Sequence, residues 1–444
     1  MESSGHSPQN QPPNPNGLGA TLSRREFLRR AGGGALLSAA SACQPRPKAG
    51  QEARPEHPFA AFDREMEQFM APRKVPGGAL AVVKDRRLVY ARGYGWADRE
   101  AQEPVRAGSL FRIASVSKPI TAVAALQLVE QGRLGLDQTA LDLLPIEPFL
   151  PAGQTPDARL RRITVRHLLQ HTGGWDRYQS LDPMFRAVEI AKALDVPRPA
   201  KPRDVIRYIL GRRLDFEPGT RYAYSNFGYC VLGRIIERVS GLTYEQQVRA
   251  QVLAPIGIQD MRIGASLASG RAPGEVRYYT AKGESGPNVF PDPPKKVPAP
   301  YGTFHLEAMD AHGGWLASAV DLARFAAALD DPTHNPLLKP DTFATMYAPP
   351  PPPPWRTADG KLQDHYYGCG WLVRPVGKEG RANYWHGGSL PGTFGWLVRR
   401  WDGVSWVVLF NQRSEQSKLP DEAIDAALHR AADAVKEWPT GREL

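Results

Sequence analysis

Strand-forming runs occur near both ends of this chain, and a long helix-rich stretch separates them. Near the N-terminus, residues 78–83 and 88–94 are apolar runs joined by a charged turn. Near the C-terminus the runs are 370–374, 395–400 and 405–411, with glycine-containing turns between them. Runs joined by hairpin-type turns pair antiparallel. We therefore predict one central antiparallel sheet, closed by the two ends of the chain and flanked by helices.

Helical patterns dominate residues 135 to about 300. Apolar residues recur at three-to-four spacing in 165–170, 202–210 and 227–240. Residues 265–305 hold many Gly, Pro and Lys residues with little periodicity, and we expect them to form a long excursion outside the core. The middle of the chain is thus predicted to be an inserted, mainly helical region on one side of the sheet. Further helices are predicted at 59–70, 320–329 and 420–435.

The overall composition is that of a globular protein. At 444 residues the chain is long enough for one large domain or two closely joined ones, and we assign residues 59–444 to the folded part. The formal net charge is +10. Lys and Arg residues neither cluster nor alternate with aromatic residues, as they do where nucleic acid binds. We therefore expect no nucleic-acid partner.

The first 43 residues resemble a twin-arginine export signal. Arg24 and Arg25 are followed by Phe27-Leu28, after a long polar leading segment. A weakly apolar run of small residues follows, which is too short to span a bilayer. The segment predicts export to the periplasm or cell envelope.

The export segment ends at a cysteine. Ala40-Ser41-Ala42-Cys43 resembles a lipoprotein cleavage box, in which Cys43 would become the lipidated first residue. A larger aliphatic residue is usual where Ala40 stands, so plain cleavage near Ala42 is the alternative. Residues 44–58 then form a polar, proline-bearing tether. We expect no membrane contact other than this lipid anchor.

Two further local patterns lie in the folded part. Cys230 and Cys369 both fall in segments with the pattern of packed core, and their spacing does not indicate a disulfide, so we predict two buried thiols. Residues 349–354 are six consecutive prolines, which predict a stiff polyproline II spacer.

A serine and a lysine stand one helical turn apart at the start of a predicted helix. Ser115 and Lys118 belong to the stretch 111–120, and apolar residues then recur at helical spacing until Gly132. A serine hydroxyl is a weak nucleophile, and a desolvated amine one turn away can take its proton. The positive end of the helix favours negative charge that develops there. The alternative is a solvated helix start.

A second candidate group is the Tyr-x-Asn sequence of Tyr224 and Asn226. It follows a Pro-Gly turn and precedes another predicted helix. A phenol held near a lysine can shuttle protons, and a carboxamide can bind an amide of the substrate. The alternative is a Tyr packed in the core with Asn226 as the helix N-cap.

The third candidate group is the His-Gly-Gly-Ser sequence His386, Gly387, Gly388 and Ser389. Glycines in strand-forming sequence let the backbone pass close to a ligand, and the next amide N–H can face an oxyanion. The alternative is a glycine-rich hairpin with an ordinary surface imidazole at His386.

Taken in order, these three groups resemble the motifs of the serine β-lactamase and penicillin-binding-protein superfamily. The chain looks closest to its class C β-lactamase, D-aminopeptidase and esterase branch over residues 60–430. Connecting phrases at 168–174, 219–222 and 313–315 also resemble the family. The resemblance implies a β-lactamase/transpeptidase-like α/β fold: a central antiparallel sheet flanked by helices, with an inserted mainly helical region.

The resemblance also implies an acyl-enzyme mechanism without a metal or cofactor. Ser115 would attack a carbonyl, while Lys118 and Tyr224 would share general-base and general-acid duty. Asn226 would hold the acyl side chain, and the backbone amides of Ser115 and Ser389 would form the oxyanion hole. The partner would be a small ester, amide or peptide substrate.

The third group departs from the family in one respect that bears on the substrate. β-Lactamases and transpeptidases usually carry Lys where His386 stands, followed by Thr or Ser where Gly387 stands. An imidazole of ordinary pKa, about 6.5, is mostly neutral at pH 7.5 and mostly charged at pH 5.5. We therefore expect an esterase or an amidase of the D-aminopeptidase type. A β-lactamase or D,D-carboxypeptidase is the alternative, and an inactive cell-wall binding or assembly protein is an alternative of another class.

Overall fold

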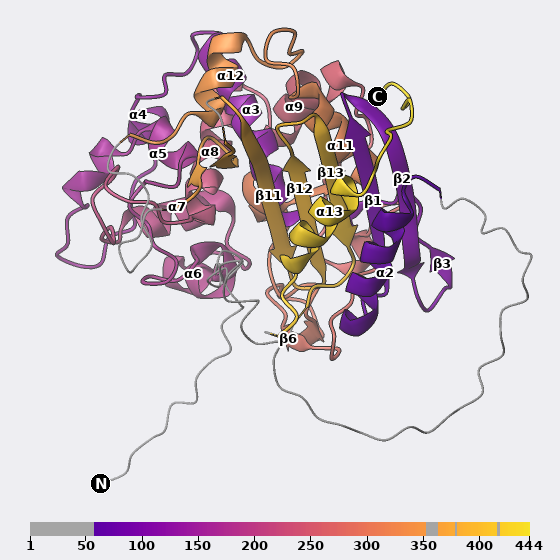
Figure 1. Cartoon of the computed structure of the whole chain (residues 1–444). Helices are drawn as coiled ribbons and strands as arrows, with labels where there is room; N and C mark the ends of the chain where they lie inside the picture. Colours follow the sequence, from indigo (N-terminus) through magenta and orange to yellow (C-terminus); the bar gives the residue numbers. More distant parts are fainter. Residues whose placement is uncertain (1–56, 352–362, 378–379, 415–417) are drawn as a thin grey trace, which may run out of the picture.

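The computed structural model describes residues 57–351, 363–377, 380–414 and 418–444 (Figure 1). The export segment with Arg24, Arg25 and Cys43, nearly all of the tether 44–58, and the second half of the proline run lie outside the described residues. The predictions made for them stay predictions.

An eight-stranded antiparallel sheet forms the centre of the fold, and both ends of the chain build it. The N-terminal strand β1 pairs with the C-terminal strand β13, with Leu80 opposite Val408. The predicted closure of the sheet by the two ends is therefore confirmed. The strands lie in the order β3 (Glu103–Pro104), β2 (Arg87–Asp98), β1 (Gly77–Lys84), β13 (Val404–Phe410), β12 (Thr393–Arg399), β11 (Ala382–Leu390), β10 (Leu372–Pro375) and β9 (Tyr366–Tyr367).

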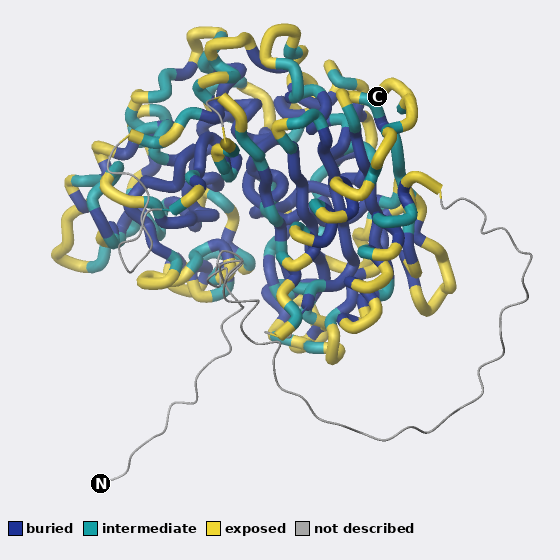
Figure 2. The backbone as a smooth tube through the Cα atoms, viewed as in Figure 1, coloured by how far each residue is buried: buried dark blue, intermediate teal, exposed yellow. Residues whose placement is uncertain are grey.

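Helices cover both faces of this sheet. Helices α2 (Ala60–Arg73) and α13 (Ala423–Asp433) pack together on one face, where they bury Leu80 and Val82 of β1. The alternate residues Ala79 and Ala81 point to the other face and its larger core, which includes α11 (Ala319–Ala328). Because side chains alternate along a strand, one run of apolar residues serves both cores. Strands β12 and β13 are accordingly buried throughout, and β1 is buried up to Lys84 at its end (Figure 2).

The helix-rich part lies beside the β11 side of the sheet, as predicted (Figure 1). Three predicted helices there, 165–170, 202–210 and 227–240, agree with the structure to within one residue at each end. In the structure these are α5 (Val165–Leu169), α7 (Pro202–Leu210) and α8 (Asn226–Ser240). The described residues also form α3 (Ser117–Glu130), α4 (Ala140–Leu143), α6 (Ala187–Leu194), α9 (Tyr244–Val248), α10 (Asp310–Gly313), α11 (Ala319–Ala328) and α12 (Pro340–Tyr347).

Two small sheets complete the fold. One consists of β4 (Phe111–Arg112), β8 (Trp315–Ala317) and β5 (Arg262–Ile263), and the other of β6 (Ser285–Pro287) and β7 (Lys296–Pro298). Strand β4 leads directly into the 3-10 helix η1 (Ala114–Val116) and then α3. The first small sheet therefore fixes the backbone that carries Ser115.

The prediction that residues 265–305 lie outside the core is wrong. Tyr278 and Tyr301 of this segment are buried in the main core, and their rings face the buried guanidinium of Arg112. The backbone N–H of Arg112 donates to the Tyr278 hydroxyl at 2.7 Å. Contacts with Arg112 of the distant strand β4 hold the segment in the core, in addition to its own short β6–β7 pair.

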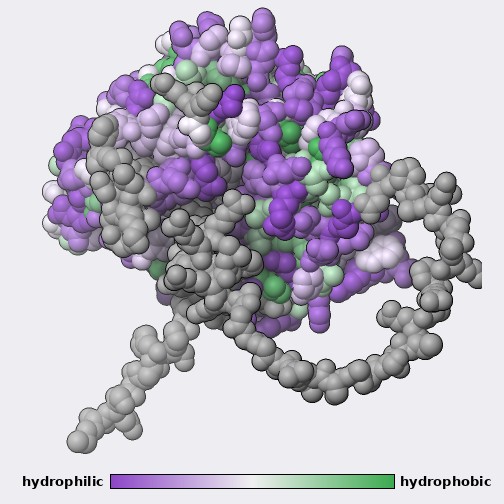
Figure 3. All heavy atoms as spheres, viewed as in Figure 1, coloured by the Kyte–Doolittle hydropathy of each residue, from purple (hydrophilic) through white to green (hydrophobic). Residues whose placement is uncertain are grey.

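The buried thiols and the surface agree with a globular domain. Cys230 and Cys369 are both free and buried, which confirms the prediction for them. Hydrophilic residues predominate on the face seen in Figure 3, with smaller hydrophobic areas between them. Among the described residues there is no helix with the length and apolar character needed to cross a bilayer.

Candidate active site

Ser115 lies on a strained turn between a strand and a helix. It is the middle residue of η1, and Ala114 before it has a left-handed φ of 46°. Such a conformation is costly for a residue with a Cβ and is found where the surroundings enforce it, often at functional sites. Ala114 and Val116 are buried, whereas Ser115 is partly exposed. The turn thus presents the Ser115 hydroxyl to a ligand.

Lys118 reaches back to Ser115 from the first turn of α3. Its Nζ lies 3.0 Å from Ser115 Oγ, 2.8 Å from Asn226 Oδ1 and 2.9 Å from the His312 carbonyl oxygen. The side chain is fully buried. Burial lowers the pKa of Lys118 well below its ordinary value; Asp182 opposes this shift and Arg177 adds to it. A neutral amine in this position can accept the Ser115 proton.

Tyr224 approaches the same hydroxyl from the other side. Its phenol donates to Ser115 Oγ at 2.8 Å, and Lys118 Nζ lies 4.7 Å from the centre of its ring. Burial raises the pKa of Tyr224. The phenol therefore stays protonated in the resting state and is ready to pass a proton on when a leaving group departs.

We expect Tyr224→Phe to lower kcat/KM for a p-nitrophenyl ester by about 10²–10⁴-fold, the usual contribution of a general acid or base. The variant keeps the ring and removes only the oxygen that contacts Ser115. Tyr222→Phe is the matched control, because Tyr222 lies in the same loop and contacts the same histidine, His171. A Tyr224→Phe enzyme as active as Tyr222→Phe would show that protons take another route.

Asn226 is held between a lysine and an aspartate. Its Oδ1 accepts from Lys118, and its Nδ2 donates to Asp182 Oδ2 at 2.6 Å. Asp182 is itself fixed, because its other oxygen accepts from the Met184 amide. The carboxamide is therefore oriented with its oxygen toward the reacting groups. The alternative interpretation of Asn226 as N-cap is wrong, since the Ser225 hydroxyl caps α8 by accepting from Gly228.

We expect Asp182→Asn to move the acid limb of the kcat/KM profile to lower pH, together with a loss of rate. The Asp182 carboxylate favours the charged form of Lys118 and so raises its pKa against the larger effect of burial. Without that charge the pKa of Lys118 falls further, and the neutral amine persists to lower pH. Asp195→Asn is the control, since Asp195 is exposed and in a left-handed conformation that Asn tolerates. An acid limb that stays in place or moves upward in Asp182→Asn would contradict this electrostatic link.

His386 is buried in β11, and the expectation of a surface imidazole or one charged at pH 5.5 is wrong. The residue is 3% exposed. Its Nδ1 lies 2.7 Å from the Gly387 carbonyl oxygen, which can only accept, so Nδ1 carries the proton. Nε2 then accepts from the Tyr367 hydroxyl at 2.9 Å. Burial, followed by the charge of Lys118, lowers the pKa of His386 to about 3. The imidazole is thus neutral across the usual range of pH.

Gly388, the second glycine after His386, allows β11 to lie against η1. A Cβ on Gly388 would lie 2.2 Å from the Ile113 carbonyl oxygen and 3.0 Å from the Ser115 nitrogen. Only glycine therefore permits this approach. It brings the chain before Ser389 against the nucleophile turn, as an oxyanion hole requires, and the roles of the Ser115 and Ser389 amides stay predictions.

His171 contributes to the site, although sequence reasoning gave it no role. Its Nδ1 accepts from the Ser225 amide at 3.2 Å, and its ring lies 4.4 Å from that of Tyr224. Its Nε2 is buried without a hydrogen-bond partner in the described part of the protein. His171 thus positions the loop that carries Tyr224. The sequence signal that pointed to His171 was its place in the segment 168–174, which resembles the family.

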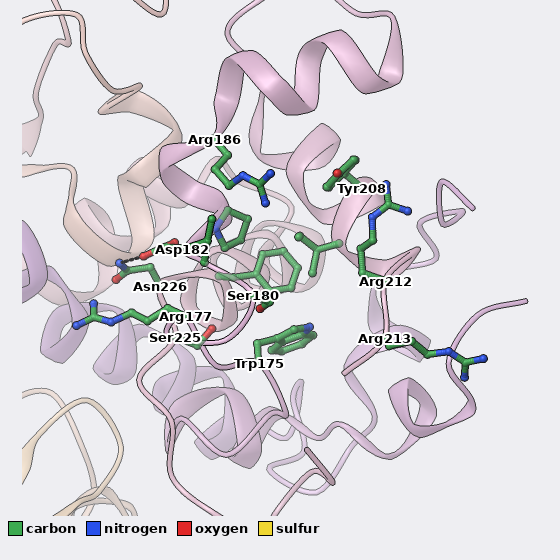
Figure 4. A pocket seen from close by; sticks show the side chains of 14 residues that line it. Trp175, Arg177, Ser180, Asp182, Arg186, Tyr208, Arg212, Arg213, Ser225 and Asn226 are labelled. Atoms are coloured by element: carbon green, nitrogen blue, oxygen red, sulfur yellow. Dashed lines mark hydrogen bonds between the residues drawn. The ribbon is translucent and has the colours of Figure 1, made fainter. Parts of the chain in front are cut away.

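A pocket of about 160 Å³ lies next to Asn226 and Asp182 (Figure 4). Trp175 and Phe227 form an apolar part of its lining, and arginines stand around it. Within the described ranges no group of three or more His, Cys, Asp or Glu side chains is placed to hold a metal ion. The site thus consists of the Ser115 hydroxyl, the Lys118 amine, the Tyr224 phenol and the adjoining pocket.

Comparison with known proteins gives a consistent result. The family model described as Beta-lactamase matches residues 62–431. Esterase EstB of Burkholderia gladioli is 29% identical over 81% of this chain and 92% of its own length. Penicillin-binding protein 4* of Bacillus subtilis is 26% identical over 79% of this chain and 71% of its own length.

Solved structures share the fold. The octameric penicillin-binding protein homologue from Pyrococcus abyssi has a TM-score of 0.63 and 26% identity, and the match covers 86% of this chain and 79% of that one. A D-amino acid amidase from Ochrobactrum anthropi SV3 has a TM-score of 0.63 at 22% identity, over 85% of this chain and 99% of that one. At that identity the amidase shows the fold alone.

Proposed function

Because this chain belongs to the β-lactamase family of serine hydrolases, we propose that it cleaves small esters or amides through an acyl-enzyme on Ser115. One observation carries the proposal: Ser115 Oγ is in hydrogen-bond contact with both Lys118 Nζ and the Tyr224 phenol. A hydroxyl between an amine of lowered pKa and a protonated phenol is equipped for nucleophilic attack.

The reaction follows from these contacts. Lys118 takes the proton as Ser115 Oγ attacks the substrate carbonyl, and the amides of Ser115 and Ser389 stabilise the oxyanion. The tetrahedral intermediate collapses and the leaving group departs with a proton from Tyr224, which Lys118 replaces. A water molecule then attacks the acyl-enzyme by the reverse proton path. The products are the acid and the alcohol or amine, and the resting state is restored.

His386 supports an esterase or amidase rather than a β-lactamase. The neutral imidazole supplies no cation, and Gly387 beside it supplies no hydroxyl, where β-lactamases and transpeptidases hold a carboxylate. The similarity to an esterase is consistent with this preference. Small acyl esters and amides do not need that carboxylate contact.

The experiment is a comparison of three substrates: nitrocefin, p-nitrophenyl butyrate and a D-amino-acid amide. We expect kcat/KM for the butyrate ester or the amide to exceed that for nitrocefin. A tenfold or greater preference for nitrocefin would replace the esterase assignment by the β-lactamase alternative. A protein that a fluorophosphonate fails to label and that turns over none of the three would instead fit the inactive binding protein.

The double substitution His386→Lys with Gly387→Thr would introduce the residue types that β-lactamases usually carry here, but the packing of β11 does not accommodate them. A Cβ on Gly387 would lie 2.3 Å from the ring of Trp396, so a threonine does not fit there without moving that ring. His386→Lys alone would replace a neutral, hydrogen-bonded group by a buried cation. The packing of β11 therefore disfavours the side chains with which β-lactamases bind a carboxylate at these two positions.

We also propose that the protein is exported through the twin-arginine route and resides in the periplasm or cell envelope. Arg24→Lys with Arg25→Lys should leave the precursor in the cytoplasm, as measured by cell fractionation. Arg29→Lys with Arg30→Lys changes a second arginine pair in the same segment and should be exported normally. Normal export of the first double variant would show that its arginine pair is incidental.

A further inference from the structure

Arg177 places a guanidinium beside the catalytic groups. It follows α5 in the loop of residues 170–186, and its guanidinium carbon lies 4.8 Å from the centre of the Tyr224 ring. The loop is anchored by Asp176, which accepts from the Tyr178 amide and pairs with Arg221. Figure 4 shows Arg177 beside Ser225 and Asn226, with its guanidinium directed away from Trp175. The charge thus lies on the catalytic side of the pocket.

Arg177 has no acidic partner within the described residues. Its guanidinium donates to the Tyr178 hydroxyl at 3.0 Å and forms no ion pair there. Of the two acids in the same loop, Asp176 pairs with Arg221, and Asp182 accepts from Asn226 and acts on Arg177 only through its charge. Arg186, which also lines the pocket, differs from Arg177 because it pairs with Glu189. A half-buried guanidinium without a carboxylate retains donors for an anionic ligand.

The pocket beside Arg177 defines the shape of such a ligand. Its volume of about 160 Å³ corresponds to roughly five water molecules, or a short chain. Trp175 and Phe227 supply apolar lining, while Asn226 and Arg177 both line the side next to the catalytic groups. An acyl group that Asn226 holds would therefore pass Arg177.

We propose that Arg177 binds a carboxylate carried by the acyl part of the substrate, so that the preferred substrates are monoesters or monoamides of short dicarboxylic acids. This inference rests on the proposed function. Arg177 would bind the anion on the helical side of the site. On the sheet side, His386 and Gly387 supply no cation and no hydroxyl for a carboxylate. A planar guanidinium binds a carboxylate through two parallel hydrogen bonds.

The test compares two esters of the same length, mono-p-nitrophenyl adipate and p-nitrophenyl 5-carbamoylpentanoate. The first ends in a carboxylate and the second in a neutral amide of similar shape. We expect the full-length enzyme to favour the carboxylate in kcat/KM by about 10- to 100-fold, the range for a hydrogen bond to a charged group. Arg177→Met, which keeps the stem and removes the charge, should bring this ratio close to one.

Arg212→Met is the matched control. Arg212 also lines the pocket, but its guanidinium stacks on Tyr208, 4.2 Å from the ring centre. Its substitution should leave the ratio unchanged. Arg177→Met also removes a charge that lowers the pKa of Lys118, but this affects both substrates equally and cancels in the ratio.

The remaining outcomes separate the two proposals. If the unmodified enzyme does not favour the carboxylate, or if Arg177→Met keeps the preference, the assignment of Arg177 is overturned while Ser115-dependent ester cleavage stands. If neither ester is cleaved and no fluorophosphonate label reaches Ser115, the proposed function fails first. A preference that Arg212→Met abolishes and Arg177→Met does not would move the anion site to the far side of the pocket.

Discussion

Replacing Ser115 by alanine is expected to abolish hydrolysis, with a loss of roughly 10⁴-fold or more in kcat. The Ser115 oxygen is the atom on which the amine of Lys118 and the phenol of Tyr224 converge. Alanine removes that atom and leaves no group in its place. Because Ser115 is partly exposed and its neighbours carry the packing, the variant should remain folded. Rates with p-nitrophenyl butyrate and the thermal midpoint measure the two effects.

Ser117→Ala is the matched control for the nucleophile. Ser117 lies two residues further on, is buried, and donates to the Ala114 carbonyl at 2.7 Å. Its loss should loosen the turn modestly and leave the acylation site intact. Mass spectrometry should therefore find the fluorophosphonate label on Ser115 in Ser117→Ala and no label in Ser115→Ala. A label on any other serine would refute the assignment.

Replacing Lys118 is expected to have the second largest effect, several orders of magnitude in kcat/KM. Without a base the Ser115 hydroxyl is a poor nucleophile. Lys118→Met keeps an unbranched apolar stem in a fully buried position and removes only the amine. It also leaves the Asn226 and His312 oxygens without their donor, so some loss of stability is expected and the thermal midpoint must be recorded.

Lys118→Arg distinguishes a proton acceptor from a mere positive charge. An arginine stays charged at all usual pH values and cannot take a proton from Ser115. We therefore expect Lys118→Arg, when folded, to be as inactive as Lys118→Met. Activity of Lys118→Arg within tenfold of the unmodified enzyme would mean that Lys118 acts only through its charge. The proton acceptor would then have to be sought elsewhere.

Local sequence determined much of this protein. The apolar runs that form β1 and β13 predicted strands, and their places near the two ends of the chain predicted that these ends close one sheet. The helix at 202–210 was predicted with its observed ends, since proline at its start and glycine after it are direct local signals. The same local logic placed Ser115 and Lys118 together, since they are three residues apart where η1 leads into the first turn of α3.

Other features depended on contacts between distant residues, and only the tertiary structure decided them. Asp182 and Asn226 are 44 positions apart, and no local pattern connects a loop aspartate with a carboxamide at a helix start. Similarly, the burial of Tyr278 and Tyr301 depends on Arg112, far away in the chain.

The charge state of His386 also depends on contacts that only the tertiary structure supplies. Its residue type alone implied a titratable imidazole, whereas burial beside Lys118 and Tyr367 keeps it neutral. The free energy of a charged group depends on desolvation and on nearby charges, and both are properties of the assembled fold. The sequence therefore determined which groups are present and which lie one turn apart. The tertiary structure alone decided their protonation and their distant partners.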